Sequence, residues 1–222
     1  MVRSSLHIAT WNARSLCHKV DELLHLIVNE KLDVLLITDT WLSNTIRLLV
    51  PGFRIHRRDR PDRDGVGVAI VIRDNILHQL TGITDMELSE AVAITIAGEN
   101  NPITLACIYI PPDRRLPTQD LETIRALDPQ LLWGGVFNIT HHSWGCPTVN
   151  RRGQQLRRYT MTHQLTIYHP GEPTYIPDAA NRHPQVLDFF LPPPGLSVRE
   201  IKTHYTGTSD HSPVSSYRTA YR

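Results

Sequence analysis

The sequence predicts an α+β protein in which β-sheets pack face to face and helices lie outside them. Many short apolar runs rich in β-branched residues indicate strands, whereas few segments have the spacing of a helix. The two kinds of element do not alternate strictly, which argues against a sheet built only of repeated β–α units. With 222 residues, 41% of them hydrophobic, the chain is long enough to form one sizeable domain over residues 1–222.

The first half of the chain is expected to contain one helix among several strands. Leu6–Trp11 is a short strand, and the apolar residues of Cys17–Lys31 recur at helical spacing, with Ser15 as the expected cap. Leu32–Thr38 is almost entirely apolar, which is typical of a strand covered on both faces. A mixed-charge loop is expected over Arg57–Asp64. Further strands are expected at Phe53–His56, Val66–Ile72, Ala91–Ala97 and Ile103–Ile110.

The last two of these strands are expected to form a hairpin, because Asn100–Pro102 supplies a turn between them. Two more helices are expected, at Thr118–Leu127 and at Asn150–Leu165. The inward positions of the second include Leu156, Tyr159 and Leu165. Strands of the second half are expected at Leu131–Trp133, which ends on Gly134–Gly135, within the turn-containing Gly171–Ile176, and at Val186–Leu191, Val198–Tyr205 and Val214–Tyr217.

Composition excludes some classes of function and leaves others open. The net charge is +1, so no bulk electrostatic field draws the chain to nucleic acid or membrane. The basic residues are nearly all arginine, which suits phosphate recognition, although compositional bias explains this equally well. Three cysteines cannot all pair, and no apolar signal segment precedes the first strand, so we expect a reducing compartment, the nucleus or cytoplasm. No run approaches the roughly 18 apolar residues of a membrane span.

Polar side chains at the ends of apolar strands are the candidates for function. Any one of them alone is well explained as a turn former or a satisfied buried polar group. Asp188 is harder to dismiss, because it lies between apolar neighbours and an unpaired buried carboxylate costs several kcal/mol. His211 is the best candidate for its partner, since a buried carboxylate commonly orients a histidine in hydrolytic sites. The full set is Asn12, Asp39, Tyr109, Asn138, Asp188, Asp210 and His211.

Such a set suits a hard divalent cation. Carboxylates, asparagines and one histidine favour Mg²⁺, or Mn²⁺ in its place, with phosphate as a further ligand. Structural zinc is disfavoured because the cysteines are isolated. The adjacent His141 and His142 point in different directions, which also argues against zinc.

Nine motifs in order resemble the exonuclease–endonuclease–phosphatase superfamily, and more narrowly the apurinic-type endonuclease domain of non-LTR (LINE-like) retrotransposons. Singly they are weak signals, but together, at family-like spacings, they cover nearly the whole chain. The stretches NRRGQQL and HHSWG favour the retroelement branch over phosphatases and sphingomyelinases. The motifs are WNARSL (11–16), DVLLITDTWL (33–42), GVGVAIVIRD (65–74), CIYIPP (107–112), WGGVFNITHHSWG (133–145), NRRGQQL (150–156), PTY (173–175), LDFFL (187–191) and SDHSPV (209–214).

The resemblance implies a four-layer, DNase I-like α/β sandwich with its site at the sheet ends. It implies that Asn12 and Asp39 bind a divalent metal and that Asp210 helps to bind the metal and to position the nucleophile. Family members hydrolyse a phosphodiester of double-stranded DNA and leave a 3′-hydroxyl that primes reverse transcription. The expected partners are therefore DNA and a reverse-transcriptase polyprotein, of which this chain is a fragment or to which it is cognate.

The remaining roles follow from the same resemblance. Tyr109 and Asn138 are implied to contact the scissile phosphate, and Asp188 to orient the catalytic His211. The metal ion is implied to stabilise the transition state and the leaving oxygen.

The chain departs from the family pattern at two positions. Asp39 stands where the family has glutamate, and because Mg²⁺ requires short, near-octahedral contacts we expect weaker metal binding. Val136 stands where the family motif G-D-F-N has its aspartate, which would activate the attacking water. A positioned acid–base group contributes about 10²–10⁴-fold, so we expect severely reduced nicking, with His211 or Asp210 compensating in part. Decay of an element copy, retention for binding, and deliberate inactivation are the competing explanations, of which we favour decay.

Two other functions remain open. The first is a non-catalytic DNA- or protein-binding module on the same scaffold, in which a helix face bearing Arg151, Arg152, Arg157 and Arg158 contacts phosphates; a solvated helix surface is the simpler explanation of these arginines. The second, weaker alternative is a phosphomonoesterase or sphingomyelinase-like hydrolase.

Overall fold

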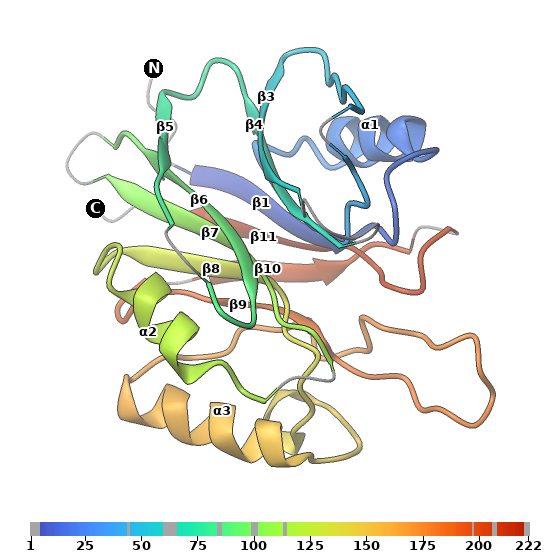
Figure 1. Cartoon of the computed structure of the whole chain (residues 1–222), viewed down its shortest axis with the longest axis vertical. Helices are drawn as coiled ribbons and strands as arrows, with labels where there is room; N and C mark the ends of the chain where they lie inside the picture. Colours follow the sequence, from blue (N-terminus) through green and yellow to red (C-terminus); the bar gives the residue numbers. More distant parts are fainter. Residues whose placement is uncertain are drawn as a thin grey trace.

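The computed structural model describes residues 5–43, 45–59, 66–83, 86–98, 102–112, 115–196, 198–205 and 208–219. Over these residues the chain forms two packed β-sheets with helices on both outer faces (Figure 1). Helix α1 (Val20–Asn29) packs on one sheet, and α2 (Thr118–Arg125) and α3 (Arg151–Thr162) pack on the other. The predicted α+β class and its four-layer sandwich are therefore confirmed.

The first sheet has six strands in the order β10-β11-β1-β2-β4-β3. Only β1 and β2 run parallel, and α1 lies between them in the chain; the other neighbours are antiparallel. The strands are β1 (Ser5–Asn12), β2 (Val34–Thr38), β3 (Phe53–Arg58), β4 (Val68–Arg73), β10 (Val198–Thr203) and β11 (Val214–Thr219).

The second sheet has five strands in the order β5-β6-β7-β8-β9. Strands β6 and β7 are antiparallel, which confirms the predicted hairpin, whereas β7 and β8 are parallel and connect through α2. The strands are β5 (His78–Thr81), β6 (Glu90–Ile96), β7 (Ile103–Tyr109), β8 (Leu131–Val136) and β9 (Asp188–Leu191).

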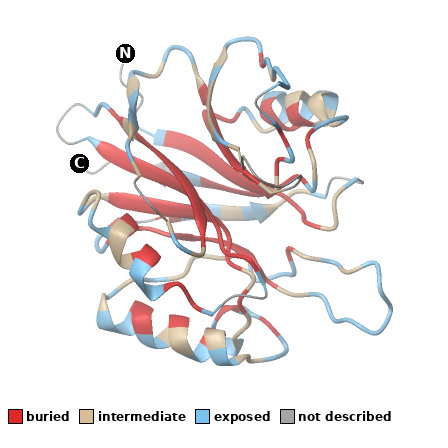
Figure 2. Cartoon of the chain, viewed as in Figure 1, coloured by how far each residue is buried: buried red, intermediate tan, exposed pale blue. Residues whose placement is uncertain are grey.

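The main core fills the space between the sheets. Its side chains come from both inner faces, and Figure 2 shows the central strands as almost continuously buried. Residues from β1, β2 and β4 meet residues from β6, β7 and β8, including Leu36, Ile70, Leu105 and Leu132. Separate apolar clusters join α1 to the first sheet and α2 and α3 to the second. These packed layers hold the strand ends rigidly in place.

The topology explains why functional candidates far apart in sequence meet. The carboxyl ends of β1 and β2 lie at one edge of their sheet because these strands are parallel, and the same holds for β7 and β8. Strands β9 and β11 run antiparallel to β8 and β1, so they begin at the same edge at which β8 and β1 end. Residues that follow β1, β2, β7 and β8 therefore lie near residues that precede β9 and β11.

Strand β8 continues beyond its predicted end. We expected the strand to end on Gly134–Gly135, but it pairs with β7 and β9 through Val136. The glycines are required by close approach instead: a Cβ on Gly135, at φ 147°, would lie 1.9 Å from the carbonyl oxygen of Ile108. A Cβ on Gly134 would meet Leu36 of the facing sheet at 2.6 Å.

The start of α1 was also predicted wrongly. Ser15 was the expected cap, but the helix is preceded by Lys19 and has no side-chain cap. Ser15 has a φ of 81° and accepts a hydrogen bond from the amide of Cys17 at 3.3 Å, so it belongs to the turn before the helix.

Three other expectations need correction or lie outside the described residues. Strand β5 was not predicted, and Gly171–Ile176 forms only isolated bridges at Tyr175 rather than a strand. Arg57 and Arg58, expected in a loop, belong to β3, while the rest of that loop from residue 60 is outside the described residues. The expected turn residues 100 and 101 also lie outside them.

Among the helices of the described ranges, none has the length and apolarity needed to span a membrane.

Candidate active site at the sheet ends

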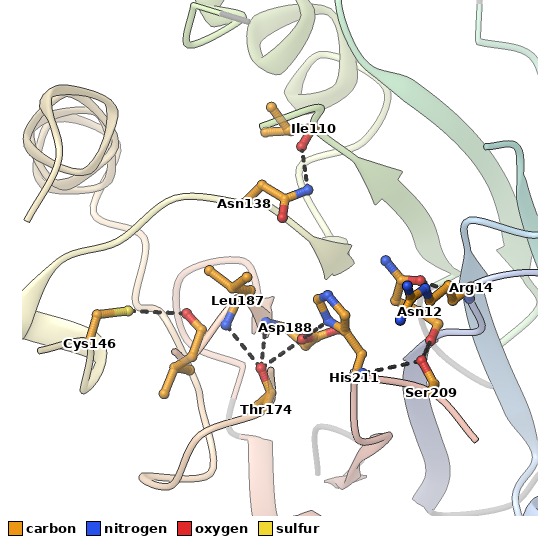
Figure 3. Close-up of polar contacts among 11 residues, drawn as sticks. Asn12, Arg14, Ile110, Asn138, Cys146, Thr174, Leu187, Asp188, Ser209 and His211 are labelled. Atoms are coloured by element: carbon orange, nitrogen blue, oxygen red, sulfur yellow. Dashed lines mark hydrogen bonds and ion pairs between the residues drawn. The ribbon is translucent and has the colours of Figure 1, made fainter. Parts of the chain in front are cut away.

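Asp188 and His211 form a buried pair. Asp188 opens β9 and is fully buried, and its Oδ2 lies 2.8 Å from Nδ1 of His211. The hydroxyl of Thr174 donates to the same Oδ2 at 2.7 Å and accepts from the amides of Leu187 and Asp188 at 2.9 and 3.1 Å. Figure 3 shows this network, with Thr174 and Asp188 on one side of His211 and Asn12 on the other. The histidine is therefore held through Nδ1, which leaves Nε2 for other partners.

The backbone holds the His211 segment against the segment that carries Thr174. The amide of Ser212 donates to the carbonyl of Thr174 at 2.7 Å, and Ile176 donates to the carbonyl of Asp210 at 2.8 Å. The ring of Tyr175 lies against that of His211, with centroids 4.8 Å apart. The orientation of the imidazole is thus fixed by backbone pairing as well as by the carboxylate.

The surroundings of His211 favour its protonated form. Burial, the largest single effect, lowers the pKa of this histidine, whereas the charge and the hydrogen bond of Asp188 raise it. The charges of Asp210 and Asp39 act in the same direction, so the net pKa is raised above 6.5. The carboxylates around His211 therefore stabilise its protonated form.

Asn12 connects the end of β1 to the same segment. Its carbonyl accepts from the hydroxyl of Ser209 at 2.8 Å, and that hydroxyl accepts from the amide of His211 at 3.2 Å. The side-chain Oδ1 of Asn12 accepts from the amide of Arg14 at 3.0 Å. A single serine therefore joins the first strand to the histidine segment, 197 residues further along the chain.

Asp39 follows β2 in a left-handed conformation, with a φ of 58°. Its Oδ1 accepts from Nε1 of Trp41 at 2.7 Å. Burial raises the pKa of Asp39, and the charge of Asp210 adds to this, while Trp41, His211 and Arg14 oppose it. Asp39 therefore lies within electrostatic reach of the other predicted metal ligand, Asp210, and of His211.

The donor set fits a hard divalent cation in its chemistry. Asn12, Asp39 and Asp210 offer one amide oxygen and two carboxylates, which Mg²⁺ and Mn²⁺ prefer. Asp39 is a half-buried acid whose pKa is raised, so a nearby cation would stabilise its charged form. No group of three histidine, cysteine, aspartate or glutamate side chains in the described ranges could hold an ion. An ion here would therefore depend on the amide of Asn12.

Four strands of the second sheet place a row of side chains at this edge. Glu90 pairs with Tyr109, Tyr109 with Val136, and Val136 with Asp188. Residues paired directly across a sheet point to the same face, so all four side chains face the first sheet. Val136 is completely buried among the residues of the main core. The predicted phosphate contact Tyr109 and the predicted orienting residue Asp188 thus flank the position at which the family aspartate is missing.

Asn138 follows the same row. It has a φ of 52°, and its Nδ2 donates to the carbonyl of Ile110 at 3.0 Å (Figure 3). An amide group has two N–H donors, and among the described residues one of them is left after this contact. The carbonyl of Phe137, just before it, accepts from Arg152 of α3 at 3.4 Å, which ties the loop to that helix.

The four arginines of α3 do not act as one equivalent set. Arg152 donates to the carbonyl of Pro112 at 2.6 Å as well as to Phe137, so this side chain fixes the position of α3. Arg158 donates to the carbonyl of Gln154 within the helix at 3.4 Å. Their predicted contact with phosphates stays a prediction, with Arg152 the least available of the four.

Three residues that organise the site received no individual role from the sequence. Thr174 and Ser209 lie within the quoted motifs PTY and SDHSPV, but hydroxyl residues before a turn are common and carry no specific signal. Arg14 lies in WNARSL, and its Nη1 is 3.4 Å from Oδ2 of Asp210 and 3.1 Å from Oδ2 of Asp178. Only the tertiary contacts reveal these three.

Comparisons with known proteins agree with the fold and with the motifs. A family model described as endonuclease-reverse transcriptase matches residues 103–215. The chain is 29% identical over 220 residues to an RNA-directed DNA polymerase from the mobile element jockey of Drosophila melanogaster, covering 96% of this chain and 24% of that relative. The chain therefore spans about a quarter of the length of the curated relatives that it matches.

Two solved structures show the same fold. The endonuclease domain of TRAS1, a telomere-specific non-LTR retrotransposon, superposes with a TM-score of 0.82 at 18% identity, covering 98% of this chain and 99% of that one. A 3′-5′ exonuclease from Neisseria meningitidis superposes with a TM-score of 0.71 at 18% identity, covering 97% and 100%. The matched family model covers more than half of the chain. The chain belongs to the endonuclease-reverse transcriptase family, which is of the exonuclease–endonuclease–phosphatase type.

Proposed function

We propose that this domain, residues 1–222, hydrolyses phosphodiester bonds of double-stranded DNA with a divalent cation and that its turnover is weak. The nick would supply the 3′-hydroxyl that primes reverse transcription by a polyprotein of which this chain is a part. The observation that carries the proposal is the buried Asp188–His211 pair, at 2.8 Å, beside Asp39 and Asp210 at the sheet ends. A buried histidine held by a carboxylate and surrounded by further acids is difficult to explain as a purely structural feature.

Asn12, Asp39 and Asp210 would hold the cation. When bound, Mg²⁺ or Mn²⁺ would neutralise charge that develops on the phosphate oxygens. Asp39 is one methylene shorter than the glutamate of the family motif, so we expect weak binding at this position.

His211 would bind the scissile phosphate as a hydrogen-bond donor. Asp188 holds its Nδ1, which leaves Nε2 to face the substrate, and the protonated ring would donate from Nε2 to a phosphate oxygen. Tyr109 and the free N–H of Asn138 would contact the same phosphate. These three groups would orient the phosphorus for attack by water and stabilise the charge of the transition state.

Val136 explains the proposed weakness of turnover. A valine has no lone pair, so no acceptor at this position removes the proton from the attacking water. His211 is held through Nδ1 by Asp188 and is assigned here to the phosphate, so it does not replace the missing base. Loss of one positioned acid–base group corresponds to roughly 10²–10⁴-fold in rate.

Nicking of supercoiled plasmid in the presence of Mg²⁺ or Mn²⁺ tests the proposal. Wild type is expected to nick slowly, and Val136→Asp combined with Asp39→Glu is expected to nick at least 100-fold faster, in line with the contribution of a general base. Adding His211→Ala to this double variant is the matched control and should abolish the gain. A folded double variant that nicks no faster than wild type would contradict the proposal.

A second function is favoured by Val136, an apolar residue that packs in the main core at the position where the family motif has an aspartate. We infer that a scaffold that keeps the proposed phosphate contacts Tyr109, Asn138 and His211 but lacks the base serves as a DNA-binding module. Binding to nicked or bent duplex should then weaken steeply with salt, because each neutralised phosphate releases counterions. Salt-independent binding, or none, counts against this alternative.

A further inference from the structure

Arg14 interacts with all three predicted metal ligands. Its amide donates to Oδ1 of Asn12 at 3.0 Å, and its guanidinium Nη1 lies 3.4 Å from Oδ2 of Asp210. Its charge also acts on Asp39, whose pKa it lowers against the larger effect of burial. Figure 3 shows Arg14 beside Asn12 at the edge of the site. A positive side chain therefore already pairs with one of the carboxylates that would hold the cation of the proposed function.

The position of Arg14 is specified by the backbone around it. Arg14 and Ser15 have φ values of 46° and 81°, a conformation that costs non-glycine residues about 1–3 kcal/mol each. Hydrogen bonds on both sides hold this turn: Ala13 donates to Thr38 at 3.0 Å, and Ser15 donates to Asp39 at 2.9 Å. The strained turn thus joins the ends of β1 and β2 and directs the arginine toward the site.

The guanidinium also has a partner outside the predicted ligand set. Nη1 of Arg14 lies 3.1 Å from Oδ2 of Asp178, whose side chain is 81% exposed. Asp178 belongs to the segment between Tyr175 and Gln185. These two residues form a β-bridge at the base of the segment, which extends away from the body of the protein (Figure 1). Arg14 can therefore release Asp210 and keep an ion pair.

We propose that Arg14 is a resident counter-cation for Asp210, which a divalent ion must displace to bind, and that Asp178 retains the guanidinium after displacement. The inference rests on the proposed function in one respect, the assignment of Asn12, Asp39 and Asp210 as ligands. Two like charges cannot share one carboxylate without mutual repulsion. The balance between Asp210 and Asp178 therefore sets the affinity for the cation.

This arrangement predicts opposite effects for two substitutions. Arg14→Gln removes the competing charge and should tighten Mn²⁺ binding about tenfold, the size expected for a partly solvated charge near a divalent ion. Asp178→Asn removes the alternative partner, so the guanidinium stays on Asp210 and Mn²⁺ binding should weaken severalfold. Affinities are measured without DNA from the electron paramagnetic resonance signal of free Mn²⁺.

Arg115→Gln is the matched control, because Arg115 also forms an exposed ion pair, with Glu87 at 3.5 Å, but lies outside the site. It should leave Mn²⁺ affinity unchanged. Asp210→Asn serves as the ligand control and should weaken binding in both the wild-type and Arg14→Gln backgrounds.

The outcomes separate this inference from the proposed function. If wild type binds Mn²⁺ through Asp210 but Arg14→Gln leaves the affinity unchanged, the counter-cation role is wrong while the metal site stands. If Arg14→Gln instead lowers DNA affinity without changing Mn²⁺ affinity, Arg14 is a phosphate contact and the inference is overturned. If no variant binds Mn²⁺ up to millimolar concentration, both proposals fail.

Discussion

Val136 lies directly opposite Asp188 in the antiparallel pair of β8 and β9, and both side chains face the first sheet. On its other side Val136 pairs with Tyr109 of β7. The position therefore belongs at once to the core and to the row of candidate functional side chains. Valine contributes apolar packing here, whereas an aspartate would place a second carboxylate next to a buried one.

Val136→Asp alone should destabilise the protein, and more so at high pH. The new carboxyl group would be buried beside Asp188, so its charged form is disfavoured and its pKa in the folded state lies above its unfolded value. The destabilisation is therefore small where the group is protonated and grows as pH rises through the unfolded pKa, to about 3–5 kcal/mol for an uncompensated buried charge. Urea unfolding at pH 4.5 and pH 8 measures this.

Val136→Thr is the control for that experiment, because it has the same shape and no ionisable group. Its destabilisation should be the same at both pH values. An equal destabilisation by Val136→Asp, relative to wild type, at both pH values would mean that water or a cation already compensates the new charge.

Thr174→Val should lower stability by about 1–3 kcal/mol. The hydroxyl of Thr174 accepts from the amides of Leu187 and Asp188 and donates to Asp188, so valine leaves buried polar groups without partners. Thr174→Ser keeps the hydroxyl and should recover most of the loss. Urea unfolding of the three proteins at neutral pH provides the comparison; a valine variant as stable as the serine variant would show that these bonds contribute little.

Much of the fold could be predicted because burial imposes a pattern on the sequence. Strands such as β2 and β7 are buried along their whole length and read as apolar runs. Strand β5 could not be recognised, because this edge strand has no fully buried residue and its sequence, HQLT, lacks a pattern. The extent of β8 was misjudged because Gly134 and Gly135 signal a turn locally, whereas close packing of the sheets is what requires them.

The candidate site could be predicted in part because its polar side chains lie at the ends of apolar strands. Asp188 stood out because a carboxylate inside an apolar run needs a partner, and the structure supplies His211 as that partner. Ser209 and Arg14 could not be found in this way, since their partners lie up to 197 residues away and their own neighbourhoods are ordinary turns. The order of the strands in the sheets decides which polar turn residues face inward. The pattern of apolar residues does not encode that order.

The stability of the protein should fall below pH 6.5 because of His56. Its Nε2 lies 2.8 Å from Nε2 of His78, an imidazole contact that joins β3 of one sheet to β5 of the other. Burial, with smaller contributions from His78 and Arg54, lowers the pKa of His56 below its ordinary value of 6.5. The unfolded chain therefore binds the proton more readily, so stability is complete above pH 6.5 and is lost as pH falls through the folded-state pKa.

His56→Gln keeps an N–H donor for His78 but cannot be protonated. Its stability, measured by urea unfolding between pH 5 and pH 8, should depend less on pH than that of wild type. His18→Gln, at an exposed histidine, is the control and should follow the wild-type profile. Identical profiles for wild type and His56→Gln would exclude this histidine as a source of the pH dependence.

Gly153→Ala should destabilise the protein although alanine favours helices by about 1 kcal/mol over glycine. Gly153 lies in the first turn of α3, where its amide donates to the capping side chain of Asn150 at 2.7 Å. A Cβ here would lie 1.9 Å from the carbonyl oxygen of Thr140, so α3 must shift away from the loop that carries Asn138. Overpacking of this kind costs about 1–3 kcal/mol.

Gln154→Ala is the neighbouring control, since its side chain is exposed and the change should stay within about 0.5 kcal/mol of wild type. Urea unfolding of the two variants separates helix propensity, which would favour both, from close packing, which opposes only the first. A stabilised Gly153→Ala variant would mean that α3 can move without loss. The glycine of NRRGQQL would then have no role in holding the Asn138 loop.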